Sequence, residues 1–304
     1  MPKMTLEGLL SRPRPILLDG ATGTELARRG IDTGLPLWSA HALRSPRGRR
    51  ALRAIHEDYA RAGAEVIVTN TFRTTRRALR KGGAEDDWRL LNRRAVECAR
   101  EATGAIPGHA CLVAGGIAPL EDCYRPDLVP AQRECLEEHR RQVDLLAGLG
   151  IDLIFIETMN SMREAEAALV AARASGLDVL LSLCPAPPDR LLSGEPLAEV
   201  VPALVAAGGS RLRALLLNCA TPEALETIYP RLAALVGDRP HGLYAHLGQP
   251  DDVTGWRLPD RHDPEGYARW MERRLGEGAR LVGGCCGTTP EHIAALRALL
   301  ESRR

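Results

Sequence analysis

Residues 132–157, QRECLEEHRRQVDLLAGLGIDLIFIE, contain the unit on which the predicted fold depends. The first part of this stretch has apolar side chains at Leu136, Val143 and Leu146, a spacing close to the helical repeat. Its last part is short and almost wholly apolar, which is typical of a strand buried on both faces of a parallel sheet. The stretch therefore predicts a helix at Gln132–Gly148 followed by a buried strand at Leu153–Glu157.

The same alternation of helix and strand extends over the whole chain. Short runs rich in Val, Ile and Leu are separated by longer segments rich in Ala, Leu, Arg and Glu, such as Gly48–Ala62. Eight such units in about 300 residues predict a single α/β domain over residues 1–304, a closed (β/α)8 TIM barrel. An open doubly wound sheet is the alternative, but the usual dinucleotide-binding fingerprint does not follow the first strand. The predicted strands are Ile16–Asp19, Glu65–Asn70, Ala110–Gly115, Leu153–Glu157, Val179–Cys184, Ala214–Asn218, Gly242–Ala245 and Arg280–Gly283.

Composition and charge argue against two classes of partner. The chain has 304 residues, and 40 Lys and Arg against 39 Asp and Glu leave a formal net charge of +1. This balance suggests neither a nucleic acid nor an anionic membrane as partner. No apolar run reaches the roughly 18 residues that span a bilayer, and the first residues lack the apolar core of a secretory signal. We therefore predict a cytoplasmic protein; nothing in the sequence indicates its oligomeric state.

Polar residues follow several of the predicted strands. In a closed parallel barrel the chemistry lies just beyond the carboxyl ends of the strands, where these residues would meet at one mouth. The segments at these ends are DGATGT at 19–24, TNT at 69–71, ET at 157–158, NC at 218–219 and GGCCG at 283–287.

Three cysteines in these segments predict a metal site. Cys219 ends the sixth strand, and Cys285 and Cys286 follow the eighth, so one strand separates them. Three thiolates with a fourth position open form a soft tetrahedral zinc site of the catalytic type. Adjacent cysteines rarely pair with each other because the disulfide would be strained. The alternative is that the Cys-Cys pair consists of two small apolar residues without a role.

The other five cysteines are predicted to be less important. Cys98 lies in a predicted helix, Cys111 in the third predicted strand, and Cys135 at the start of another predicted helix. We expect all three to be buried. Cys123 and Cys184 lie nearer the mouth and are rivals to the three proposed ligands. A disulfide framework is not expected in a cytoplasmic chain of this size.

A site of three thiolates and zinc suits a particular reaction. Its net negative charge weakens zinc as an acid toward water but suits the binding of a further thiol as a reactive thiolate. Such a thiolate attacks an electrophilic methyl group, so alkyl transfer to a thiol is the expected chemistry. A non-enzymatic zinc or redox-thiol protein is an alternative, but it would not need Asp19 and Glu157 in the same mouth.

Five segments resemble the zinc-dependent homocysteine S-methyltransferases over nearly the whole chain and in the same order. The resemblance implies a (β/α)8 barrel, a Zn2+ site of three cysteines, homocysteine as methyl acceptor and methionine as product. The segments are LDGATGTEL at 18–26, TNTF at 69–72, IFIET at 154–158, NC at 218–219 and GGCCGTTPEHI at 283–293.

The resemblance also assigns roles to individual residues. It implies Cys219, Cys285 and Cys286 as zinc ligands, and Glu157 as the partner of the homocysteine ammonium group. The residues implied to dock the amino-acid end of the substrate further include Asp19, Gly20, Thr22, Gly23 and Asn218. An alternative role for Asp19 is a helix N-cap, and for Glu157 a structural ion pair with a barrel arginine.

The methyl donor is left open by the resemblance, because members use S-methylmethionine, S-adenosylmethionine, betaine or methyl-folate. The form DGATGT at 19–24 favours a sulfonium donor, whose leaving group is good enough for direct in-line displacement. The nucleophile would be the zinc-bound substrate thiolate, with no separate protein nucleophile. Asn70 and His246 are possible donor-side residues; His246 stands where members often have asparagine. A different thiol acceptor, or betaine or methyl-folate as donor, remains an alternative.

Overall fold

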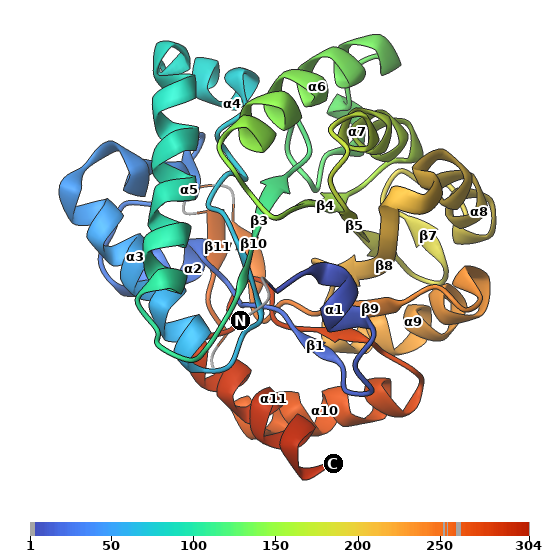
Figure 1. Cartoon of the computed structure of the whole chain (residues 1–304). Helices are drawn as coiled ribbons and strands as arrows, with labels where there is room; N and C mark the ends of the chain where they lie inside the picture. The colour runs from blue at the N-terminus through green and yellow to red at the C-terminus, as the bar shows by residue number, and fades with distance from the viewer. Residues whose placement is uncertain (1–3, 252, 254, 260–262, 304) are drawn as a thin grey trace.

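The computed structural model describes residues 4–251, 253, 255–259 and 263–303. Eight parallel strands follow one another in the order β1-β12-β9-β8-β5-β4-β3-β2 (Figure 1). These strands are β1 (Ile16–Leu17), β2 (Val66–Val68), β3 (Leu112–Ile117), β4 (Leu153–Met159), β5 (Val179–Leu183), β8 (Leu212–Asn218), β9 (His241–Tyr244) and β12 (Leu281–Val282).

The two ends of this strand order meet and close the ring. Leu18 forms a parallel bridge with Val66. On either side of the bridge, the Glu65 amide donates to the Leu17 carbonyl at 2.7 Å and the Asp19 amide to the Val66 carbonyl at 3.1 Å. The predicted TIM barrel is therefore confirmed, and the alternative of an open doubly wound sheet is wrong.

Helices surround the barrel, as Figure 1 shows. The predicted helix Gln132–Gly148 is α6 with the same bounds, and the predicted segment Gly48–Ala62 corresponds to α3 (Pro46–Arg61), which Ser45 caps. The other α-helices are α1 (Leu6–Leu10), α2 (Gly23–Arg28), α4 (Arg76–Lys81), α5 (Trp88–Gly104), α7 (Met162–Ala174), α8 (Leu197–Gly208), α9 (Pro222–Val236), α10 (Pro264–Gly276) and α11 (Pro290–Ser302). In the described parts of the chain, no helix is long and apolar enough to cross a membrane.

The loops between these helices and strands contain short 3-10 segments and hairpins. The 3-10 segments are η1 (Trp38–Arg44), η2 (Glu85–Asp87), η3 (Pro126–Leu128) and η4 (Gly209–Arg211). Two antiparallel hairpins are β6 (Pro185–Ala186) with β7 (Arg190–Leu191), and β10 (Gln249–Asp251) with β11 (Gly255–Arg257).

The third strand differs most from its predicted bounds. β3 begins at Leu112 and ends at Ile117, two residues later than predicted. Cys111 therefore precedes the strand, is only half-buried, and donates from its thiol to the Ala64 carbonyl at 3.1 Å. The prediction that Cys111 is buried inside the strand is thus wrong, while Cys98 and Cys135 are buried as expected.

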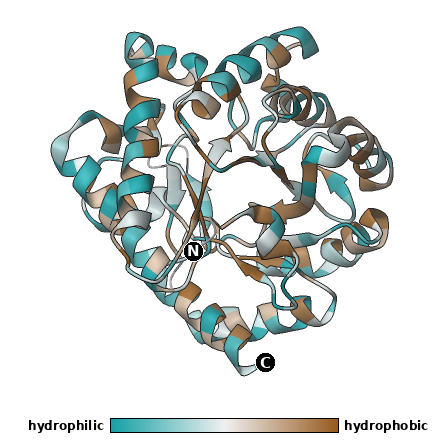
Figure 2. Cartoon of the chain, in the orientation of Figure 1, coloured by the Kyte–Doolittle hydropathy of each residue, from teal (hydrophilic) through white to brown (hydrophobic). Residues whose placement is uncertain are grey.

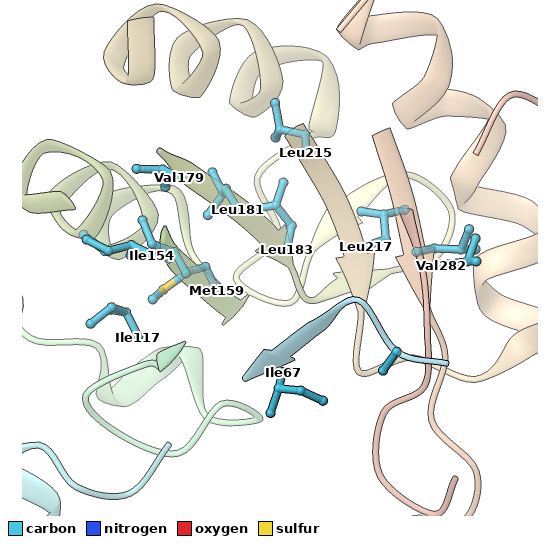
Figure 3. Packing of buried hydrophobic residues seen from close by; sticks show 14 of the residues in the cluster. Ile67, Ile117, Ile154, Met159, Val179, Leu181, Leu183, Leu215, Leu217 and Val282 are labelled. Carbon is cyan, nitrogen blue, oxygen red and sulfur yellow. The ribbon is translucent and has the colours of Figure 1, made fainter. Parts of the chain in front are cut away.

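Alternating side chains divide the apolar core into two layers. On β4, Leu153 and Phe155 face the barrel interior, where they pack with Leu6 and Leu9 of α1, which lies in front of the strands in Figure 1. Residues of the other strand face pack against the helices; Figure 3 labels ten of them, among them Ile154 and Leu215. The helices turn their polar faces outward (Figure 2).

The alternation of side chains along each strand also determines which of them lie at the carboxyl end of the barrel. Because side chains alternate along a strand, the residue after Leu153 and Phe155 on the inward face of β4 is Glu157. On β8, Ala214 and Leu216 are inward-facing, and Asn218 is the next residue in that series. The apolar interior thus ends in polar side chains at the mouth.

Candidate active site

A pocket opens at the carboxyl ends of the strands, where the sequence predicted it. Nine of the predicted site residues line it: Asp19, Gly20, Thr22, Gly23, Asn70, Glu157, Cys219, Cys285 and Cys286. Asn218 and His246 are not among the described residues that form its walls.

The three predicted metal ligands come together in this pocket. The sulfur atoms of Cys219 and Cys285 are 3.1 Å apart, and the Cys286 thiol interacts with both. Cys219 has a left-handed backbone (φ 54°), which is uncommon for a residue with a side chain and often marks a functional position. Gly287 is left-handed as well (φ 84°), and a Cβ there would overlap the Leu247 carbonyl, so this turn requires glycine.

The three thiols differ in their ease of ionisation. The neighbouring thiols Cys219 and Cys286 donate to Cys285, which lowers the pKa of Cys285. The same interactions and burial raise the pKa of Cys219. A single negative charge on the cluster is therefore most stable on Cys285.

The donor set fits zinc in chemistry more closely than in spacing. Thiolate is the softest ligand that proteins offer to zinc, and bonds of about 2.3 Å in a tetrahedron separate two sulfurs by about 3.8 Å. The Cys219 and Cys285 sulfurs, at 3.1 Å, are closer than this. Accordingly, within the described residues no group of three His, Cys, Asp or Glu side chains has the spacing of a metal site. Moving the Cys219 and Cys285 sulfurs roughly 0.7 Å further apart would bring them to the spacing of a tetrahedral zinc site.

Asp19 belongs to the loop between β1 and α2. Its Oδ2 accepts a hydrogen bond from the Val68 amide at 2.8 Å, and burial raises its pKa to about 8. The residue that precedes α2 is Thr22, so the alternative role of Asp19 as the N-cap of this helix is wrong. Tyr59 stabilises this loop, because its hydroxyl donates to the Ala21 carbonyl at 2.9 Å.

Glu157 is a buried carboxyl at the end of the barrel interior. Burial, and then the negative charges of Cys285 and Asp19, raise its pKa well above the ordinary value. No arginine is among the groups that act on it in the described residues, so the geometry does not favour the alternative of a structural ion pair. A cation that binds next to a buried carboxyl stabilises its charged form.

Asn218 lies behind the pocket wall. It is fully buried; its Oδ1 accepts from the Ser182 hydroxyl at 2.7 Å, and its Nδ2 donates to Thr158 Oγ1 at 2.8 Å. The geometry does not favour the predicted substrate contact, because the amide is already bonded to the protein at both ends.

The two possible donor-side residues lie in different surroundings. Asn70 lines the pocket, and its Nδ2 donates to the Ser39 carbonyl at 2.9 Å. His246 is buried behind the wall, with Nδ1 3.5 Å from the Tyr124 hydroxyl and its ring 4.9 Å from that of Trp256. Burial lowers the pKa of His246 and thereby favours the neutral imidazole.

Aromatic side chains form much of the remaining wall, and the sequence analysis did not identify them. Six of the eleven aromatic residues line the pocket, although aromatic residues make up only 4% of the chain. This concentration of a rare residue type within and after the strands is the signal that could have revealed them. They are Trp38, Phe72, Tyr124, Phe155, Tyr244 and Trp256.

The two rival cysteines have different positions. Cys123 lines the pocket, and burial raises its pKa to about 12. Cys184 is buried and donates from its thiol to the Cys219 carbonyl at 3.7 Å. Only Cys123 therefore shares the pocket with the three thiols.

A closed parallel barrel with three thiols and two buried carboxyls at the carboxyl ends of its strands has the form of a barrel enzyme that works on small molecules. The family model described as homocysteine S-methyltransferase matches residues 16–300. The chain belongs to the homocysteine S-methyltransferase family, and it is a methyltransferase.

Individual relatives agree with this assignment. A homocysteine S-methyltransferase of Escherichia coli is 33% identical over 96% of this chain and 97% of its own length. A selenocysteine methyltransferase of Astragalus bisulcatus is 26% identical over 95% and 93%. The crystal structure of the homocysteine methyltransferase MmuM from Escherichia coli in its metallated form superposes with a TM-score of 0.83 and 33% identity, covering 96% of this chain and 99% of that one.

Proposed function

We propose that this enzyme transfers a methyl group from a sulfonium donor, S-methylmethionine or S-adenosylmethionine, to the thiol of homocysteine and so produces methionine. The observation that carries the proposal is the contact between the Cys219 and Cys285 sulfurs, in a pocket that Glu157 and Asp19 also line. Membership of the homocysteine S-methyltransferase family supports homocysteine as the acceptor. In this proposal, residues 1–304 act as one homocysteine-binding barrel domain.

Cys219, Cys285 and Cys286 would hold the metal, which we propose to be zinc. Their soft thiol donors, and the metallated form of the Escherichia coli relative, support this choice. Bound there, Zn2+ would supply the Lewis acidity that makes a substrate thiol react as a thiolate near neutral pH.

Glu157 would bind the ammonium group of homocysteine. Burial, and then the proximity of Cys285 and Asp19, disfavour the charged form of this carboxyl, so a positively charged ligand group would stabilise the carboxylate as well as form a hydrogen bond. The loop of Gly20, Thr22 and Gly23 would receive the carboxylate through its backbone amides. A Cβ at Gly23 would overlap the Trp38 ring, so glycine keeps this loop close to its neighbours.

The aromatic walls support a positively charged donor. Trp38, Phe72, Tyr124 and Trp256 line the pocket, and a sulfonium is a compact cation that aromatic ring faces attract. Asn70 lines the same pocket and would contact the donor, whereas His246 would act through Tyr124. In the reaction, a bond forms between the acceptor sulfur and the methyl carbon, and the bond to the sulfonium sulfur breaks. The bonding pair stays on the departing neutral thioether, so the positive charge disappears.

The test is an assay on purified protein whose zinc content has been measured. Homocysteine is supplied with S-methylmethionine, S-adenosylmethionine, betaine or methyl-folate in separate reactions, and methionine is quantified. We expect turnover with a sulfonium donor, and we expect Cys285→Ala to lose both zinc and activity while circular dichroism stays unchanged. Cys98→Ala, which changes a buried cysteine of α5 far from the pocket, is the control.

The same assay also tests one alternative methyl acceptor. The chain's similarity to a selenocysteine methyltransferase makes selenocysteine the first substitute for homocysteine to be tried. A clear preference for selenocysteine, or turnover with betaine or methyl-folate alone, would contradict the proposed substrates. Full activity in zinc-free protein would contradict the proposed metal site.

A further inference from the structure

Three successive hydrogen bonds link side chains of neighbouring strands and end at the Cys219 sulfur. The Ser182 hydroxyl donates to Asn218 Oδ1 at 2.7 Å, and Asn218 Nδ2 donates to Thr158 Oγ1 at 2.8 Å. The Thr158 hydroxyl in turn donates to the Cys219 sulfur at 3.8 Å. Ser182, Asn218 and Thr158, here called the Cys219 relay, come from the three neighbouring strands β5, β8 and β4.

The direction of the relay follows from its chemistry. The Asn218 amide nitrogen can only donate, so the Thr158 oxygen accepts this bond and its single proton is left to donate to the sulfur. The Asn218 amide is likewise oriented by Ser182, which donates to its oxygen. All three side chains are buried, so water does not compete for these bonds. Each link therefore fixes the orientation of the next.

Two unusual backbone conformations meet at the end of the relay. Thr158 (φ 67°) and Cys219 (φ 54°) are both left-handed, although neither is glycine. For a β-branched residue such as Thr this conformation is a genuine outlier, with a cost that the surrounding structure must offset. The pairing of β4 with β5 shifts register between Ile156 and Met159, which marks an irregularity in the strand around Thr158. The irregular backbone directs the Thr158 hydroxyl at the sulfur.

We propose that the Cys219 relay positions the Cys219 sulfur as a metal ligand. This inference rests on the proposed zinc site. Groups that hydrogen-bond to metal ligands orient them, and their loss commonly weakens metal binding 10- to 100-fold. The relay also gives Asn218 a task that explains why its amide faces the protein: it is a positioning residue for Cys219.

The test compares Thr158→Val with Thr158→Ser. Valine keeps the β-branched shape and the backbone strain of Thr158 but cannot donate, whereas serine keeps the hydroxyl. Zinc affinity is measured by competition with a chelator, and the cobalt-substituted protein is examined for its sulfur-to-cobalt charge-transfer absorption. We expect Thr158→Val to bind zinc about 10-fold more weakly, with a shifted charge-transfer band. Thr158→Ser should stay within about 2-fold of the unmodified protein.

Two further variants separate a positioning role from a structural one. Ser182→Ala leaves Asn218 without its donor and should weaken zinc binding in the same direction but less. Thr74→Val removes another buried threonine hydroxyl, one that bonds to Asn92 at 2.7 Å, and should lower Tm without changing zinc affinity. Since Ser182→Ala tests the relay independently, the proposal remains testable even if Thr158→Val does not fold.

The outcomes distinguish the relay from the zinc site on which it depends. If Thr158→Val or Ser182→Ala lowers Tm but leaves both zinc affinity and the cobalt spectrum unchanged, the relay only ties the strands together and the proposal is wrong. If the unmodified protein binds neither zinc nor cobalt, the proposed site itself is wrong and the relay fails with it. Weakened binding in both variants, with Thr158→Ser near normal, supports the relay.

Discussion

At the scale of single residues, the surroundings of Glu157 disfavour its charged form in the absence of a ligand. Its carboxyl is buried near Cys285 and Asp19, two groups that also become negative on ionisation. A homocysteine ammonium group would convert this repulsion into attraction. The role of Glu157 can therefore be tested separately from that of the thiols.

We expect Glu157→Gln to raise the KM for homocysteine at least 10-fold and to leave zinc content unchanged. The glutamine keeps the shape but loses the charge, and a hydrogen bond between charged partners contributes about 1.5–3 kcal/mol. Steady-state kinetics with varied homocysteine, together with metal analysis, give both quantities. Glu65→Gln removes a buried carboxyl at the opposite end of the barrel and serves as control. An unchanged KM in Glu157→Gln would exclude the proposed contact.

The sequence identified residues at strand ends better than residues between them. Cys219, Cys285 and Glu157 were predicted to meet because barrel topology brings strand ends together. Trp38 and Tyr124 could not be predicted in this way, since they lie in loops whose course has no periodic pattern. The orientation of Asn218 was also beyond the sequence, because it depends on the hydroxyls of two neighbouring strands.

At the scale of elements, α3 shows how much a periodic pattern can predict and what it omits. Its buried side chains include Leu52, Ile55 and Tyr59, spaced as one face of a helix, and the predicted bounds differ from the observed ones by one or two residues. The same face carries His56, which is fully buried. Strand bounds are less well predicted, as β3 shows, because a short apolar run allows the strand to begin and end two residues later without changing its period.

His56 makes the stability of this element sensitive to acid. Burial lowers its pKa from 6.5 to about 4, so the folded protein holds this imidazole neutral while the unfolded chain binds a proton below pH 6.5. Stability should therefore decline as the pH falls from about 6.5 towards 4, by up to about 3 kcal/mol from this residue alone. The free energy of urea unfolding, measured at several pH values, should fall less steeply in His56→Leu. Parallel pH profiles for the two proteins would contradict this assignment.

At the scale of the whole molecule, the barrel depends on the contact between β1 and β2, the two ends of the strand order, here called the seam. β1 has only two residues, and Leu18 and Val66 form an isolated bridge beside it. Glu65 reinforces this seam from inside the protein. Its carboxylate pairs with Arg12 and Arg14 at 2.6 Å each. It also lies 3.4 Å from the Leu17 amide, so one side chain joins the N-terminal segment, β1 and the residue before β2.

Glu65→Gln should lower the free energy of unfolding by about 2–3 kcal/mol, because it leaves two arginines without their buried partner. The loss is expected to be below that of a fully buried pair, since Arg12 and Arg14 are partly exposed. Glu57→Gln, which removes the Arg53 ion pair on the surface of α3, is the matched control and should cost less than about 1 kcal/mol. Urea unfolding of both variants measures the difference. Equal losses would mean that backbone pairing alone holds the seam, whereas the expected inequality would show that a single buried carboxylate secures the closure of the barrel.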